Sequence, residues 1–124
     1  MNNHTTLTGN LTRNPELRYT TSGRAVATFG LAVDRRYQRD GAWHDDTSYF
    51  DVTAWGDLAE NTAASLTTGH RVTVTGRLEQ HTWQTDQGDT RHRIDVVATD
   101  VAASMRFTPV RLTAPERTGT GEVA

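Results

Sequence analysis

The sequence predicts a single all-β domain, a small closed barrel with one short helix. Its 124 residues leave room for one hydrophobic core. Apolar and polar residues alternate over several segments, which is typical of half-buried strands. Threonine occurs 22 times, and this β-branched residue favours pleated, half-buried positions over helix interiors. Only 35% of the residues are hydrophobic, so we expect a thin core.

Five segments carry the strand alternation. The opening segment directs Leu7 and Leu11 inward, and the second strand is expected to continue beyond its alternating residues and to end at Tyr37. Asp40-Gly41 and Gln87-Gly88 are hairpin-turn dipeptides between neighbouring segments. The alternation covers residues 5–11, 25–33, 49–55, 71–78 and 94–99.

One helix is expected between the third and fourth strands. Asp57 is placed to cap it, and Glu60 follows at capping-box spacing. One face of this helix is formed by Leu58, Thr62, Ala63 and Leu66, and Gly69 marks its carboxyl-terminal end. Three strands, a short helix and two more strands are the order of the OB fold, a five-stranded Greek-key barrel with its helix between strands 3 and 4.

The composition limits the classes of protein and site that this chain can represent. It has no cysteine, which excludes disulfides and thiolate metal sites. The amino-terminal residues do not have the pattern of a signal peptide, and no apolar run is long enough to span a membrane. The net charge of −2 conceals a local +4 over residues 1–39 and a local −6 over residues 40–60. A basic face can therefore bind phosphates although the whole chain is slightly acidic.

Catalytic and nucleotide-binding motifs are missing from the sequence. The five histidines are scattered without metal-ligand spacing. We therefore predict a protein that is not an enzyme and that needs neither a metal nor a cofactor.

Four aromatic residues are the candidate binding residues: Tyr37, Tyr49, Trp55 and Trp83. Tyr49 and Trp55 are six residues apart, so they share the polar face of the third strand. Aromatic side chains on a polar face have no core to fill, so they stack on a ligand or pack against a partner. Stacking on a nucleic-acid base contributes about 1–3 kcal/mol whatever the base. For any one of the four, partial burial over a small core is an equal alternative.

Several motifs resemble bacterial single-stranded DNA-binding proteins. The similarity runs collinearly over about residues 5–105. It is carried by the segments Thr8–Tyr19, Ser22–Ala27, Leu31–Val33, Trp55–Glu60 and Gly69–Leu78 and by the hairpin with Trp83. The resemblance implies an OB fold, a homotetramer (or else a dimer) and sequence-independent binding of single-stranded DNA in replication, recombination and repair.

The resemblance also assigns roles to residues. By position, it implies that Tyr37, Tyr49, Trp55 and Trp83 stack on bases. Independently of the resemblance, the arginines that we expect to contact phosphates are Arg35, Arg36, Arg71, Arg77 and Arg91. Asp57, Glu79 and Thr82 stand where familiar members carry basic residues.

The carboxyl-terminal end departs from the family pattern. We expect a DNA-binding domain over residues 1–106, an extended arm over 107–112 that contacts another subunit, and a flexible tail over 113–124. The sequence ends without the acidic tip and terminal Pro-Phe through which the family recruits repair enzymes, so it resembles a short paralogue, for example one used in chromosome segregation. The expected location is the cytoplasm, at the nucleoid.

Two other interpretations stay open. One is an accessory primosome protein of the same fold, which bridges other proteins. The other is an OB-type interaction module whose aromatic face binds a protein or an oligosaccharide.

Overall fold

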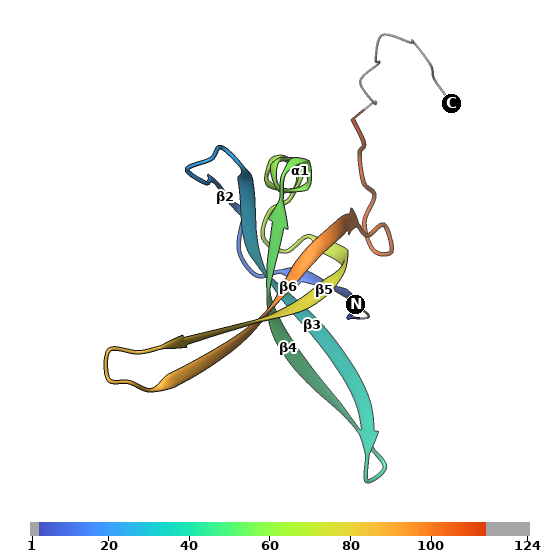
Figure 1. Cartoon of the computed structure of the whole chain (residues 1–124). Coiled ribbons are helices and arrows are strands. Elements are labelled where there is room, and N and C mark those ends of the chain that lie inside the picture. Colours follow the sequence, from blue (N-terminus) through green and yellow to red (C-terminus); the bar gives the residue numbers. More distant parts are fainter. Residues whose placement is uncertain (1–2, 114–124) are drawn as a thin grey trace.

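A computed structural model describes residues 3–113 and shows a small β-barrel with long hairpins that project from it (Figure 1). The strands are β1 (Thr5–Leu11), β2 (Glu16–Tyr19), β3 (Ala25–Arg39), β4 (Ala42–Trp55), β5 (Arg71–Gln84) and β6 (Thr90–Ala103). One helix, α1 (Asp57–Ser65), lies between β4 and β5.

Five strands close the barrel in the order β1–β5–β6–β4–β3, and β3 returns to pair with β1. All neighbours are antiparallel except β4 and β6, which pair in parallel at Val52 with Val96 and at Thr53 with Val97. This mixed five-stranded barrel, with a helix between its third and fourth strands, confirms the predicted OB fold. The short strand β2, which pairs with β3, was not predicted from the sequence.

The core lies inside the barrel and is built from the apolar residues of the alternating segments. Its largest fully buried side chains are Phe29, Leu31, Val52, Val72, Val74 and Val96. Leu11 is buried and Leu7 packs against the core, as the alternation predicts. The bulge between β5 and β6 beside Gly76 brings two backbones together so closely that a Cβ atom there would overlap the carbonyl oxygen of Val97.

Helix α1 packs against the barrel through Ala59, Thr62 and the following Leu66, all of which are buried. The predicted capping by Asp57 is wrong, because Gly56 occupies the N-cap position with φ of 66° and no side chain caps the helix. Glu60 instead accepts a hydrogen bond at 3.0 Å from the hydroxyl of Tyr19 on β2. That bond and the negative charge of Glu60 raise the pKa of Tyr19 above its ordinary value of 10.0.

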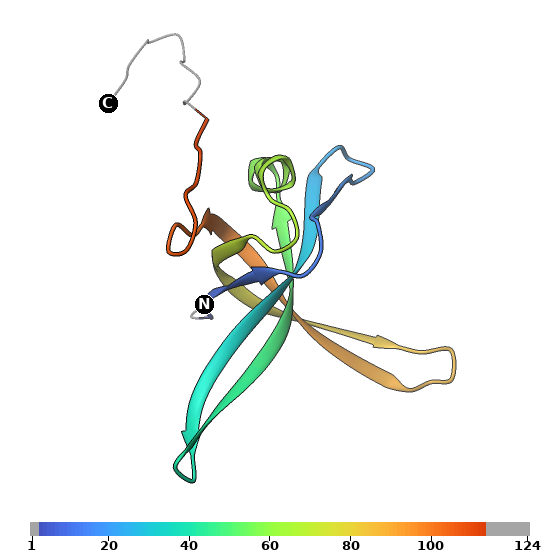
Figure 2. The same ribbon diagram turned by 180° about the vertical axis from the view of Figure 1, so that it is seen from behind.

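Two hairpins extend well beyond the barrel in different directions, β3–β4 and β5–β6 (Figures 1 and 2). The pairing of β3 with β4 runs from Val26 and Trp55 to Arg39 and Ala42 without interruption. Asp40 and Gly41 form its two-residue turn, both with positive φ, as the dipeptide predicts. The strands are longer than their apolar alternation, because backbone pairing continues past Val33, where no core remains to require apolar side chains.

The segment after β6 has no helix or strand over residues 104–113. Phe107 and Leu112 are largely exposed, and the predicted contact of residues 107–112 with another subunit stays a prediction. Residues 114–124, most of the predicted tail, lie outside the described residues. Within residues 3–113, no helix is both long and apolar enough to cross a membrane.

Candidate nucleic-acid interface

The outer surface of the barrel is formed by the residues that alternate with the core positions of β3, β4, β5 and β6. On β4 these residues include Tyr49 and Trp55, and on β5 they include Trp83. The predicted sharing of one face by Tyr49 and Trp55 agrees with the register, because the residues between them on the core face are buried fully, as Val52 and Ala54 are, or in part, as Phe50 is. Three of the four predicted aromatic residues therefore lie on the outer surface.

These three aromatic side chains differ in exposure and in their neighbours. Tyr49 is 74% exposed and Trp83 is 47% exposed, so both rings are available to a ligand. Trp55 is half-buried, and the guanidinium of Arg24 lies 4.3 Å from its ring centroid. This cation–π contact leaves Trp55 with one face already covered by a cation.

Tyr37 lies on the opposite face of the β3–β4 hairpin. It pairs with His44, and the two rings stack with centroids 5.5 Å apart and an interplanar angle of 24°. The guanidinium of Arg35 lies 4.8 Å from the Tyr37 ring. Tyr37 thus continues the core-facing side of β3 into a region without a core, and the hairpin does not bring it together with Tyr49.

Trp43 is an aromatic residue of the outer surface that the sequence analysis missed. It is 60% exposed, and the guanidinium of Arg36 lies 4.8 Å from its ring. Trp43 precedes Tyr49 by six residues, the same spacing that joins Tyr49 to Trp55. That spacing was the available signal, but the residue lies beyond the apolar alternation of the third predicted strand.

The five predicted phosphate-binding arginines fall in different surroundings. Arg91 pairs directly with Trp83 across the β5–β6 hairpin, and Arg36 faces Trp43. Arg35 and Arg77 each form an ion pair, with Asp46 at 3.3 Å and with Glu79 at 3.4 Å. A phosphate must compete with those carboxylates for the two guanidinium groups.

Arg71 does not join the other predicted arginines. It stands at the first position of β5, twelve residues before Trp83, which is roughly 40 Å along an extended strand. There it donates a hydrogen bond to Ser104, and its guanidinium lies 5.2 Å from the ring of Phe107. Its contacts therefore tie the start of β5 to the carboxyl-terminal segment.

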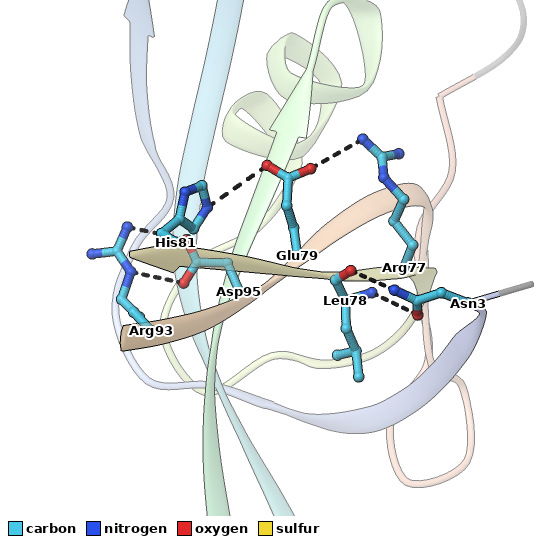
Figure 3. A network of polar contacts seen from close by, with 7 residues as sticks. All are labelled: Asn3, Arg77, Leu78, Glu79, His81, Arg93 and Asp95. Carbon is cyan, nitrogen blue, oxygen red and sulfur yellow. Dashed lines mark hydrogen bonds and ion pairs between the residues drawn. The ribbon is translucent and has the colours of Figure 1, made fainter. Parts of the chain in front are cut away.

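A chain of charged side chains crosses the outer surface between β5 and β6 (Figure 3). It runs from Arg77 through Glu79, His81 and Asp95 to Arg93. The His81 Nε2 atom lies 3.7 Å from Glu79 Oε1 and 3.3 Å from Asp95 Oδ2. Arg93 donates a hydrogen bond from Nη2 to Asp95 Oδ2 at 3.1 Å, and its Nε lies 3.0 Å from Oδ1 in an ion contact that lacks hydrogen-bond geometry. The two arginines and the two carboxylates balance, so with a neutral His81 this row of side chains carries no net charge.

Metal-binding geometry is not found in the part of the chain that the structure describes: no group of three or more His, Cys, Asp or Glu side chains could hold an ion.

Comparison with known proteins places this barrel in a family. The model of the Single-strand binding protein family matches residues 2–104. The chain belongs to this family. The family resemblance predicted from the sequence is therefore confirmed, and as a member of this family the chain is not an enzyme.

Relatives in the single-strand binding family cover most of the chain. Single-stranded DNA-binding proteins from Paenarthrobacter nicotinovorans and Mycobacterium tuberculosis H37Rv are 39% and 42% identical over 117 residues. Each alignment covers 92% of this chain, and 69% and 71% of the respective relative. The crystal structure of the small single-stranded DNA-binding protein from Streptomyces coelicolor matches with a TM-score of 0.71 and 34% identity, covering 85% of this chain and 97% of that one.

Proposed function

We propose that the chain binds single-stranded DNA without sequence preference, by stacking bases on the aromatic residues of its outer surface. The observation that carries the proposal is the exposure of large aromatic rings where no core exists: Tyr49, Trp83 and Trp43 are 74%, 47% and 60% exposed. Every base has a π face, so such rings accept any sequence. The names of its relatives, single-stranded DNA-binding proteins, support the same ligand.

Charge contributes less than stacking in this proposal. Two of the predicted phosphate contacts, Arg35 and Arg77, are neutralised by carboxylates of the same chain. Arg36 and Arg91 have no ion-pair partner among the described residues, and each lies beside an outer-surface tryptophan. We therefore expect a measurable but moderate salt dependence, since each phosphate contact on a single strand adds about 0.7 to the slope of log K against log salt.

The proposed assembly is a homotetramer, with a dimer as the alternative, and the proposed process is replication, recombination, repair or chromosome segregation. Mass measurement by light scattering separates tetramer from dimer. A dimer that binds single strands only weakly would favour the alternative of an accessory protein that bridges other proteins.

The test is a titration with dT oligonucleotides of graded length at two salt concentrations, followed by quenching of tryptophan fluorescence. Trp83→Ala should weaken binding about 5- to 150-fold, the equivalent of 1–3 kcal/mol for one lost stacking contact. Tyr19→Ala is the matched control, because Tyr19 is also an exposed aromatic residue but faces α1. Absence of saturable quenching at low salt, or equal effects of the two substitutions, would contradict the proposal.

A further inference from the structure

A polar pocket of about 240 Å³ opens on the outer surface where β3, β4 and β6 meet β2 and the segment that precedes it. Its lining is polar or charged throughout. It consists of three arginines, two carboxylates and two threonines, namely Arg13, Arg18, Arg93, Asp51, Asp95, Thr28 and Thr53. None of these residues is among the aromatic and arginine positions predicted from the sequence.

The residues that line the pocket have a net charge of +1, since they include three arginines and two aspartates. Arg13 Nη2 lies 3.3 Å from Asp51 Oδ1, and Arg93 contacts both oxygens of Asp95 at 3.0 and 3.1 Å. Arg18 also contacts Glu16, which is not part of the lining. Because a guanidinium has five N–H donors, Arg13 and Arg93 keep further donors after these contacts. Thr28 and Thr53 add hydroxyl groups, so the pocket is rich in donors for an anion.

Asp95 is the unusual member of the lining, because it is only 4% exposed. Burial of a carboxylate is unfavourable unless charged partners compensate, and a buried ion pair seldom adds net stability. The side chains in ion contact with Asp95 are Arg93 on β6 and His81 on β5, and Glu79 stands opposite Asp95 in the register. The carboxylate fixes the direction of the Arg93 guanidinium, as the exposed Asp51 does for Arg13. A guanidinium that is already held in one orientation binds the oxygens of a phosphate with less loss of conformational freedom than a freely rotating side chain.

The pocket lies between two of the stacking positions. Thr53 precedes Trp55 by two residues on the same face of β4, which is roughly 7 Å along a strand. Arg93 follows Arg91 by two residues on β6, and Arg91 pairs with Trp83. A strand whose bases stack on Trp55 and Trp83 would carry its backbone over the pocket.

We propose that this pocket is a phosphate-binding subsite, in which Arg13 and Arg93, positioned by Asp51 and Asp95, hold one phosphodiester group of the bound strand. The inference rests on the proposed binding of single-stranded DNA and adds a defined phosphate position to it. The ligand is the phosphodiester itself, so this contact is the same for every base.

Two arginine substitutions test the subsite in the full chain, with dT oligonucleotides as the probe at about 50 and 200 mM salt. Arg93→Gln and Arg13→Gln should each reduce the salt slope by up to about 0.7, the value for the one phosphodiester that they share, so the loss of affinity between those two salt concentrations becomes up to about 2.6-fold smaller. Arg106→Gln is the control, because Arg106 lies beside Phe107 in the carboxyl-terminal segment and should leave the slope unchanged. Trp83→Ala should weaken binding without changing the slope.

Substitution of the two carboxylates shows whether they position the arginines or act only through their negative charge. Asp51→Asn and Asp95→Asn each remove a negative charge, so tighter binding is expected if the carboxylates merely repel the strand. If they position the arginines, both substitutions weaken binding although the charge change favours it. Asp51 is 52% exposed in its side chain, so Asp51→Asn remains informative if the substitution of buried Asp95 prevents folding.

Outcomes for the subsite and for the proposed function are distinguishable. Saturable binding of dT by the wild-type chain, with salt slopes in Arg13→Gln and Arg93→Gln equal to the wild-type slope, overturns the subsite and leaves the proposed function intact. Tighter binding by Asp51→Asn overturns the positioning role. Absence of dT binding by the wild-type chain overturns both proposals.

Discussion

Glu79 neutralises one of the arginines expected to contact DNA, and its replacement by glutamine should strengthen binding. The Arg77–Glu79 pair spans 3.4 Å, with side chains that are 52% and 44% exposed. Exposed ion pairs of this kind contribute about 0–1 kcal/mol to folding. We therefore expect Glu79→Gln to change the free energy of unfolding by less than about 1 kcal/mol, while the surface gains one unit of positive charge.

The size of the effect on binding follows from Coulomb's law. A phosphate held by Arg77 would lie roughly 5–6 Å from the Glu79 carboxylate, so their repulsion in water is about 0.75 kcal/mol. Its removal should lower Kd about three- to fourfold at low salt, and more if the site excludes water. The salt slope should become steeper by up to about 0.7, because Arg77 can then contact a phosphate without competition. Fluorescence titration with dT oligonucleotides at two salt concentrations measures both quantities.

Asp100→Asn is the matched control for this substitution. Asp100 is exposed on β6 and pairs with Thr75 at the barrel rather than on the projecting hairpin. Its replacement by asparagine changes the net charge of the chain by the same amount as Glu79→Gln. A Kd for Glu79→Gln that equals that of the control, or that exceeds the wild-type value, would refute the reasoning that intramolecular carboxylates compete with DNA on this surface.

Three further substitutions test the packing of the barrel and the raised pKa of Tyr19. Gly76→Ala should destabilise the barrel by about 1–3 kcal/mol in urea unfolding, because its Cβ would overlap the Val97 carbonyl oxygen in the bulge and backbone atoms cannot easily move aside; unchanged stability would contradict the close approach. Phe29→Ala should cost about 3–5 kcal/mol by the same measurement, because the ring is fully buried in the core; a loss below about 1 kcal/mol would show that the core collapses around the cavity. Glu60→Gln should lower the pKa of Tyr19 toward 10.0, as followed by phenolate absorbance against pH, because it removes the negative charge that favours the protonated ring. Since the folded pKa is raised, the Tyr19–Glu60 contact stabilises the wild-type chain below about pH 10 and its contribution is lost as the pH rises through the folded value; an identical titration in both proteins would exclude the contact.

Part of the candidate binding surface follows from the sequence alone. Period two places Tyr49 and Trp55 on one face of a strand without any knowledge of the barrel, and it also places Trp43 there once the strand is extended back to the turn at Gly41. The same counting puts Tyr37 on the core-facing side of β3, which the longer hairpin confirms. Composition and motif order were sufficient for the fold class and the family.

Charge pairing could not be predicted in this way. Arg13 and Asp51 are 38 residues apart and come together only when the barrel closes. Asp95 belongs to an alternating segment that predicts a solvent-facing carboxylate, yet the parallel contact of β6 with β4 and the side chains around the pocket bury it. Arg71 has the local appearance of the other arginines, but its place at the start of β5 directs it to Phe107.

The sequence by itself determined the strand periodicity, the helix after the third strand, the turn at Asp40-Gly41 and the family, because each depends on residues that are neighbours in the chain. Only the tertiary structure decided which arginines remain free for a phosphate, that Asp95 is buried beside Arg93, and how far the two hairpins extend beyond the core. The physical reason is that alternation is a local property of an extended backbone, whereas ion pairing and burial depend on the register between strands that are distant in sequence.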